Sequence, residues 1–457
     1  MKACHTIQPV FDDPNLIAFG GLPAVMRLAE QAGLHDLVEE HVTVPGTAGS
    51  NAAVKVSALI AGMVAGADSI SDLDVLRHGG MDRVFDGLRA PTTLGTHLRG
   101  YQFGHVRQLD AVATRLFARL AVLSPILDGA QQVAYLDIDD TIRETHGYRK
   151  QGVAYGYNHV KGLNAQVAII STPTSAPVIA ATRLRKGNVS SSRGAARLIG
   201  DAMTTLHKAT TPGMVIVRAD SAYFNYDTIA AISRRGARFS VTARLNPAVT
   251  RAIAAIEETA WTAIRYPHAI WDEAQQGWIS DAEVAEVPFT AFTSRRKAEH
   301  ITARLIVRRV KRLNPKAKTQ GELLPGYRYH AVFADTTLGL VEAEACHRDH
   351  AVIEGVFADL KDGPLAHAPS GKFMANSAWL VLASMAFNLT RAAARIASKT
   401  LGRARTGTVR RTLIQVAARI ANQARTWLLH LPRDWPWEPQ LDRLYQAAFG
   451  PPTATIP

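Results

Sequence analysis

Residues 131–245 alternate between short apolar segments and longer amphipathic ones. The apolar segments are rich in β-branched and aromatic residues and are too short for helices, which predicts strands. Strands that alternate with helices indicate an α/β layered core. We expect strands at Val133–Ile138, Ala165–Ser171, Val178–Leu184, Met214–Ala219 and Ala237–Thr242, and helices at Ser191–His207 and Tyr226–Arg234.

The rest of the chain divides around this core. Residues 1–130 carry apolar residues at three-and-four spacing and are predicted to form a helical N-terminal domain. The core extends over 131–390 and contains a β-rich insertion at about 245–335, and 391–457 form a basic, helical C-terminal region. The flanking helices are expected at Leu22–Ala32, Ala52–Ala65, Ser71–Leu76, Arg107–Leu123, Ala378–Ala397 and Val409–Leu429.

The charge balance is strongly basic, with a formal net charge of +13. Ten Lys or Arg residues lie between 391 and 433 without any Asp or Glu, and ten more lie between 295 and 318 with Glu299 as the only acid. Clusters of one sign favour contact with the phosphates of a nucleic acid. The alternative is a soluble protein whose basic charge serves solubility alone.

The chain carries two cysteines, Cys4 and Cys346, which cannot build a disulfide framework. The N-terminus lacks the apolar core of a signal peptide. The apolar stretches Val56–Ala67 and Ala378–Leu389 are shorter than the ~18 residues of a membrane-spanning helix. We therefore expect a cytoplasmic protein without a membrane partner.

Carboxylates follow the first predicted strand. Because side chains alternate along a strand, Asp137, Asp139 and Thr141 share one face and Asp140 takes the other. Crowded carboxylates repel one another unless a cation or hydrogen-bond donors compensate, and hard cations such as Mg²⁺ bind such oxygens. The alternative is a strand that runs into an acidic, solvated turn. Asp137 is either a supporting partner of Asp139 or a further metal ligand.

A second acid, Asp220, directly follows the strand Met214–Ala219. Sites in α/β sheets form beyond the carboxyl ends of strands, so Asp139 and Asp220 are expected on one rim. Asp220 could equally cap the helix that follows it.

The third acid is Glu354, within a predicted helix over 347–361. His347, His350, Glu354 and Lys361 fall on a stripe next to the apolar one. A solvated helix face is the alternative. Three carboxylates from two strand ends and one late helix are what two-metal phosphoryl transfer needs, with Lys361 and the histidines placed to meet phosphate oxygens. The apolar stripe itself consists of Ile353, Val356, Phe357 and Leu360.

These residues resemble a bacterial insertion-sequence transposase of the DDE class. The likeness is greatest to the insertion-sequence family numbered thirteen-eighty, within the group that shares a Tyr–Arg–Glu–Lys signature. Asp139-Asp140-Thr141, Arg218-Ala219-Asp220-Ser221, and Glu354 with Lys361 match the family motifs in the right order. The Tyr and Arg positions hold His347 and His350, which depart from the pattern, and Arg348 is a candidate substitute for the Arg. Gly156–Gly162, which includes Lys161, also looks like the motif after the first Asp.

The resemblance implies an RNase H-like core with a β insertion before the Glu helix, and spacings of 81 and 134 residues between the acids agree with it. It implies that Asp139, Asp220 and Glu354 bind Mg²⁺, with Mn²⁺ as a substitute. The implied partners are double-stranded DNA with terminal inverted repeats and a target DNA, with a homodimer as the active complex. Residues 1–130 would then bind DNA ends or mediate dimerisation. The DNA contacts are expected at His347, Arg348, His350, Lys361, Lys161, Arg410 and Arg411.

Two alternatives remain open. One is a DNA-binding derivative of a transposase without catalysis. The other is a haloacid-dehalogenase-like phosphatase, because Asp137-Ile138-Asp139-Asp140-Thr141 also fits an Asp-x-Asp-x-Thr loop. That fold would make the first Asp a nucleophile, needs a late pair of acids that the sequence lacks, and leaves the basic charge unexplained.

Overall fold

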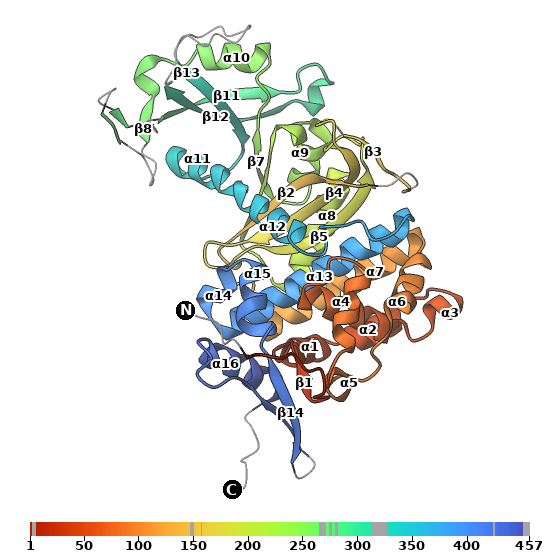
Figure 1. Cartoon of the computed structure of the whole chain (residues 1–457). Coiled ribbons are helices and arrows are strands. Elements are labelled where there is room, and N and C mark those ends of the chain that lie inside the picture. The colour runs from red at the N-terminus through yellow and green to blue at the C-terminus, as the bar shows by residue number, and fades with distance from the viewer. Residues whose placement is uncertain are drawn as a thin grey trace. The chain divides into compact units, whose positions relative to one another are not determined.

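The computed structural model describes residues 1, 6–146, 150–156, 158–264, 271–273, 277–278, 282–311, 327–423 and 426–450 (Figure 1). The chain forms two compact units. The helical unit contains residues 1–126, 145–151 and 358–457, and the sheet unit contains residues 127–144 and 152–357. These units do not follow the expected boundaries at 130 and 390, because the N-terminal and C-terminal segments share one unit.

The sheet unit is built on one mixed sheet, which has ten strands in the part of the chain that the structure describes. The strand order is β3-β4-β2-β6-β7-β13-β12-β11-β8, and β5 pairs with β4. β2 runs antiparallel to β4 and parallel to β6, and β6 runs parallel to β7. The strands are β2 (Val133–Glu144), β3 (Ala154–Tyr155), β4 (Lys161–Ser171), β5 (Val178–Lys186), β6 (Met214–Ala219), β7 (Arg238–Thr242), β8 (Thr262–Ile264), β11 (Ala282–Ala291), β12 (Ile301–Lys311) and β13 (Tyr327–Ala334).

The expected β-rich insertion is present, and it continues the core sheet. β13 pairs antiparallel with β7, so β12, β11 and β8 extend the sheet from that edge. A separate short hairpin joins β9 (Trp271–Asp272) and β10 (Gly277–Trp278). The insertion is therefore one structural body with the core strands.

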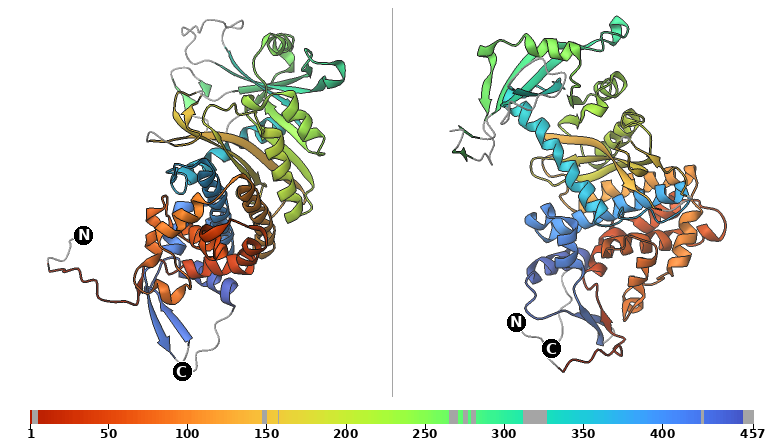
Figure 2. Two further views of the ribbon diagram at one scale, coloured as in Figure 1. Left: turned by 90° about the vertical axis from the view of Figure 1, so that its right-hand side faces the viewer. Right: turned by 45° about the horizontal axis from the view of Figure 1, so that its top comes forward.

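Helices cover both faces of this sheet. Helix α8 (Ala195–Ala209) packs on β4 and β5 with its apolar stripe, which includes Leu198, Ala202 and Leu206, and it contacts α9 (Tyr226–Ser233). Helix α11 (Leu340–Arg348) lies on the opposite face, where Ala343 joins a buried cluster with Ile306, Val332 and Ala334. The remaining α-helices of this unit in the described residues are α10 (Pro247–Ala254) and the first part of α12 (Val352–Lys361). Figure 2 shows the helices of this unit from two further sides.

The helical unit is organised around α13 (Phe373–Ala397), whose residues are mostly buried and which packs against α7, α4 and α16. By length and composition α13 could cross a membrane, since it is longer than the expected apolar stretch Ala378–Leu389, but 89% of its most apolar window is buried inside the protein. The other helices are α1 (Leu22–Gln31), α2 (Leu34–His41), α3 (Gly46–Gly49), α4 (Ala52–Ala65), α5 (Met81–Val84), α6 (Pro91–Arg99), α7 (Phe103–Leu123), α14 (Lys399–Arg403), α15 (Thr406–Val409) and α16 (Glu438–Phe449).

The prediction of a helix over Val409–Leu429 is wrong. A π-helical turn at Arg410–Ile414 is followed by the hairpin of β14 (Ala418–Gln423) and β15 (Thr426–His430), which pairs with β1 (Leu16–Ile17). Burial alternates at the start of β14, where Ala418 and Ile420 are buried and Arg419 is exposed. Apolar residues three and four apart fitted a helix, but β-branched and aromatic residues at Ile420, Thr426 and Trp427 favour the strand pairing that long-range contact with β1 completes.

Candidate active site

Asp139 and Asp140 lie within β2. The strand was expected to end at Ile138, but it continues to Glu144 because it pairs with β4 as far as Gly162. The neighbouring strand β6 ends at Ala219, which is opposite Ile138. Asp139 therefore lies where the parallel neighbour stops, and its carboxylate accepts a hydrogen bond of 2.7 Å from the backbone N–H of Asp140.

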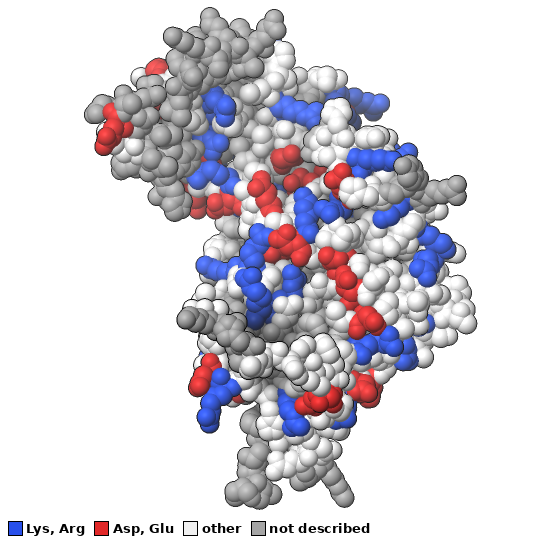
Figure 3. All heavy atoms as spheres, in the orientation of Figure 1, with Lys and Arg blue, Asp and Glu red and all other residues white. Residues whose placement is uncertain are grey.

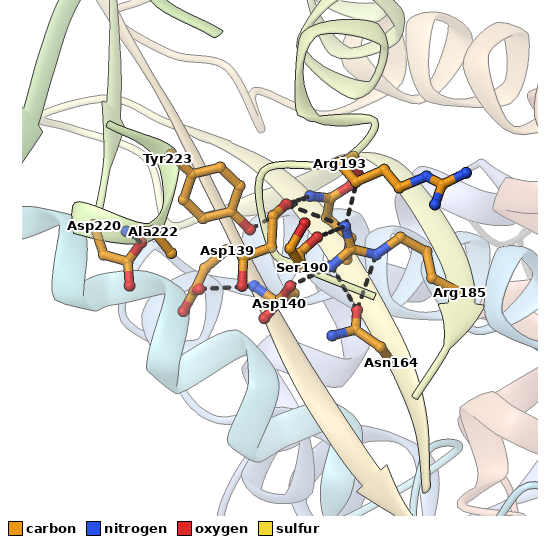
Figure 4. A network of polar contacts seen from close by, with 11 residues as sticks. Asp139, Asp140, Asn164, Arg185, Ser190, Arg193, Asp220, Ala222 and Tyr223 are labelled. Carbon is orange, nitrogen blue, oxygen red and sulfur yellow. Dashed lines mark hydrogen bonds and ion pairs between the residues drawn. The ribbon is translucent and has the colours of Figure 1, made fainter. Parts of the chain in front are cut away.

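Asp220 directly follows β6 and so stands beside Asp139 on the next strand, as Figure 4 shows. Its side chain accepts a hydrogen bond of 2.9 Å from the N–H of Ala222 and caps the turn Ser221–Tyr223. The capping interpretation of Asp220 is therefore correct, and it does not compete with the site interpretation. One oxygen caps the turn while the carboxylate keeps its place beside Asp139.

Glu354 lies in the first turn of α12 and is exposed, next to a buried stripe at Ile353, Val356 and Phe357. It is close enough to act electrostatically on Asp139. The pKa of the Asp139 carboxyl is raised to about 7, because burial and, to a lesser extent, the charges of Asp220, Asp140 and Glu354 outweigh the lowering effect of the Asp140 N–H. The three predicted acids are thus brought into one electrostatic neighbourhood.

Asp220 has a similar environment. Burial raises its pKa, the N–H of Ala222 lowers it, and the charge of Asp140 raises it. His350 and Arg244 act in the opposite direction and stabilise the charged carboxylate. Arg244 is exposed, and its Nε donates to the carbonyl oxygen of Ser221 over 3.0 Å. Arg244 was not predicted to lie beside Asp220, because its local sequence contains no motif that indicates a site residue.

The donor chemistry of this cluster fits a hard divalent cation, since Mg²⁺ prefers carboxylate oxygens. The negative charge that raises the pKa of Asp139 is also what such a cation would neutralise. Within the described ranges, no group of three or more His, Cys, Asp or Glu side chains stands close enough together to hold an ion. Asp139, Asp220 and Glu354 are the residues that would hold such an ion.

Asp140 belongs to a different network on the other face of β2 (Figure 4). Its carboxylate pairs with the guanidinium of Arg185, a buried side chain on β5. Arg185 also donates to Asn164 and to backbone carbonyls of the loop at 190–193, with Nη1 2.7 Å from the carbonyl oxygen of Arg193. Arg185 thus links Asp140 on β2 to the loop that precedes α8. Sequence reasoning missed it because its partners are far away along the chain.

Asp137 is 1% exposed, and both of its oxygens are bound by Arg218, at 2.6 Å from Nε and 2.7 Å from Nη2. Burial raises the pKa of the Asp137 carboxyl, and Arg218 lowers it. Since a phosphatase nucleophile must reach its substrate, this geometry disfavours the phosphatase alternative. In this structure Asp137 is thus a buried partner of Arg218.

The two predicted histidine contacts have different positions. His347 is buried, and its ring nitrogens lie 3.0 Å from the Ser240 hydroxyl and 2.9 Å from the Thr242 hydroxyl. Its pKa is lowered to about 3, mainly by burial and then by the charge of His350. His347 is therefore an internal link between α11 and β7, and not a surface for phosphate. His350 is half-buried and holds Nδ1 2.6 Å from the His347 carbonyl, so Nδ1 is its donor.

The remaining predicted contacts are dispersed. Arg348 pairs with Glu344 on α11, and Lys161 is exposed at the start of β4. Lys361 and Arg411 are exposed in the helical unit. Arg410 lies there too, where burial lowers its pKa and its guanidinium donates to the carbonyl of Asp362 over 3.3 Å.

The basic clusters of the sequence are partly neutralised in the fold. Acids from distant segments pair with them, for example Glu344 with Arg308 and Asp359 with both Arg391 and Arg405. Figure 3 accordingly shows Lys and Arg interspersed with Asp and Glu on the visible face. The interpretation of both clusters as uninterrupted arrays for phosphate contact is therefore too simple.

The fold is that of an α/β protein built on a large mixed sheet, with Asp139 on β2, Asp220 directly after β6 and Glu354 on α12. The comparison of the sequence with protein families identifies the family within this class. Residues 4–448 match the model of the family described as Transposase DDE domain group 1, so the chain belongs to that transposase family. Among curated proteins, none matches the sequence significantly. The expected DDE transposase class is thus confirmed.

Proposed function

We propose that this protein is a DNA transposase that cleaves the ends of its own insertion sequence and joins them to target DNA. Asp139, Asp220 and Glu354 would hold two divalent ions, Mg²⁺ or Mn²⁺. Such ions would supply the activation of water, and then of a DNA 3′-hydroxyl, for attack on a phosphodiester. The observation that supports the proposal is that Asp220 follows the strand next to that of Asp139, and that the charges of Asp220 and Glu354 both act on the buried Asp139 carboxylate.

The strand order supports an RNase H-like core for this chemistry. The segment β5-β4-β2-β6-β7 has a central strand with an antiparallel neighbour on one side and two parallel strands on the other. This is the arrangement that the resemblance implies, with the first acid on the central strand and the second after its parallel neighbour. The insertion sequence itself is proposed to belong to the thirteen-eighty family, with His347 and His350 at the Tyr and Arg signature positions.

The DNA contacts are proposed from exposed cations near the acids. Arg244 lies beside Asp220, and the half-buried His350 also acts on it electrostatically. A scissile phosphate bound to metals at the acids would meet these cations, since phosphate contacts position DNA. Lys161, Arg348, Lys361 and Arg411 remain proposed contacts along the flanking DNA. His347 is withdrawn from that group because both of its ring nitrogens are bound inside the protein.

The partners follow from this function. The protein would act in the cytoplasm, as a homodimer that holds two terminal inverted repeats and a target duplex. The non-catalytic alternative is disfavoured because all three acids are present and the charges of Asp220 and Glu354 both act on Asp139. Residues 1–130 and 391–457 are both proposed to bind DNA ends.

The test uses Asp220→Asn, since an Asn oxygen can still accept the N–H of Ala222 and keep the turn capped. We expect end cleavage on DNA with the element's own inverted repeats to disappear, while DNA binding survives. Asp201→Asn is the matched control, because Asp201 lies on α8 and pairs with Arg183 over 2.5 Å. Mg²⁺-dependent cleavage retained by Asp220→Asn would reject the assignment.

A further inference from the structure

Arg218 has the contacts of a residue that assembles the site without belonging to it. The side chain is 2% exposed and lies on β6, two residues before Asp220. We infer that Arg218 is a positioning residue that fixes the helix of Glu354 against the two strands of Asp139 and Asp220. The inference rests on the proposed function. It adds to that function the contacts that fix the relative positions of the three acids.

The first contact of Arg218 joins the two strands. Asp137 is directly opposite Arg218 in the parallel pairing of β2 and β6. The guanidinium binds both oxygens of Asp137, at 2.6 and 2.7 Å. Because strand side chains repeat every two residues, this ion pair lies on the same face as Asp139 and Asp220, one step behind them. It therefore fixes the relative register of the two strands that carry the first two acids.

The second contact joins these strands to the third acid. Nη1 of Arg218 donates to the carbonyl oxygen of Cys346 over 2.7 Å, near the C-terminal end of α11. Helix C-termini carry unpaired carbonyls and partial negative charge, so a cation is stabilised there. Glu354 is eight residues further along the chain, after a single 3₁₀ turn at Asp349–Ala351.

A second link fixes the same end of α11. His347 follows Cys346 and places its ring between the hydroxyls of Ser240 and Thr242 on β7. The end of α11 is thus held by both β6 and β7. Further back, Glu344 pairs with Arg308 of β12 over 2.9 Å, and Ala343 packs with Ile306 and Val332. The insertion therefore holds α11, the helix that leads through the 3₁₀ turn into α12 and its Glu354.

The chemistry of the contacts requires arginine. Three of its nitrogens donate at once to two carboxylate oxygens and one carbonyl, in the fork geometry of a guanidinium, and the Tyr135 ring lies 4.3 Å from the guanidinium carbon. A lysine would keep the charge but could not reproduce the paired contacts. Arg218→Lys therefore separates the loss of geometry from the loss of charge.

The test compares Arg218→Lys with Arg309→Lys in the full-length protein. Arg309 is the matched control because it is also buried, binds two carboxylates, Glu258 and Glu283, and stacks on Trp261 at 4.2 Å. It joins strands of the insertion and does not contact the strands of the acids. Single-turnover cleavage and DNA binding are measured across a Mg²⁺ series for each variant.

For Arg218→Lys we expect a DNA affinity within about twofold of wild type. Cleavage should be slower by about 100-fold, and its rate should reach half of its maximum at a Mg²⁺ concentration about tenfold higher than in wild type. Arg309→Lys should leave the Mg²⁺ dependence unchanged. Arg218→Lys with wild-type rate and Mg²⁺ dependence, or equal Mg²⁺ shifts in both variants, would overturn the inference. If Arg218→Lys does not fold, Asp137→Asn carries the same test.

A metal-free measurement separates this inference from the proposed function. Hydrogen exchange of residues 340–357 should become faster in Arg218→Lys, while that of β11 and β12 stays unchanged. Unchanged exchange in 340–357 rejects the positioning role, even if the wild type cleaves DNA. Conversely, a wild type without Mg²⁺-dependent cleavage rejects the function, and faster exchange would still establish that Arg218 holds the helix.

Discussion

Replacing Asp139 with Asn should stabilise the metal-free protein at high pH. In the folded state the pKa of Asp139 is about 7, against an ordinary value of 3.8. Between these values the folded chain binds more protons than the unfolded chain, so its stability falls as pH rises and the full penalty applies above pH 7. At 1.36 kcal/mol per pKa unit, the charged carboxylate costs about 4 kcal/mol at pH 8.

Asn avoids this penalty because it is neutral at every pH. It can still accept the N–H of Asp140, with a loss of about 1 kcal/mol for the weaker neutral hydrogen bond. The expected net gain is therefore about 3 kcal/mol at pH 8 and less than about 1 kcal/mol at pH 5. In Mg²⁺ the sign should reverse, because only the charged wild type gains from the ion.

The assay is unfolding in urea with EDTA at pH 5 and pH 8. Pulsed hydrogen exchange on peptides of β2 and β6 monitors the unfolding. This readout isolates the sheet unit from the helical unit, so that a single transition is followed. Asp201→Asn on α8 is the control and should show no such pH-dependent gain. A destabilised Asp139→Asn at pH 8, or an equal effect at both pH values, would refute the reasoning.

Two further predictions concern charge and burial. Mg²⁺ binding at pH 6 should release close to one proton, because the metal requires the carboxylate of Asp139 in its charged form. At pH 9 this proton release should vanish. Calorimetry in buffers of different ionisation enthalpy measures the number of protons released. Asp359→Asn should destabilise the helical unit by about 3–5 kcal/mol, since buried Asp359 accepts from Arg391, Arg405 and the N–H of Thr406. A change below about 1 kcal/mol in the free energy of unfolding of the helical unit, measured in urea through α13, would contradict this second prediction.

Local patterns predicted the regular elements well. The strand Met214–Ala219 and the helix Ala52–Ala65 have the expected bounds, because each is one apolar run with clear ends. β2 was predicted too short, since its second half depends on pairing with β4 and not on its own composition. The hairpin at 418–430 was missed for the same reason, because its pairing with β1 joins residues about 400 positions apart.

The site shows the same division between local and distant information. The three acids could be proposed because each lies in a recognisable segment, whereas their supporting contacts could not. Arg185 and Asp140 are 45 residues apart, and Arg218 and Cys346 are 128 residues apart. The role of His347 also depended on burial, since only the folded chain brings it against Ser240 and Thr242.

The central proposal is that Asp139, Asp220 and Glu354 hold two divalent ions for DNA cleavage. Anomalous diffraction from Mn²⁺ in crystals of the protein with cleaved-end DNA measures this directly. We predict two peaks ~3.5–4 Å apart, with Asp139 bridging them and Asp220 and Glu354 each binding one. Mn²⁺ bound elsewhere, with the DNA end in place and these three carboxylates without metal contacts, would contradict the account.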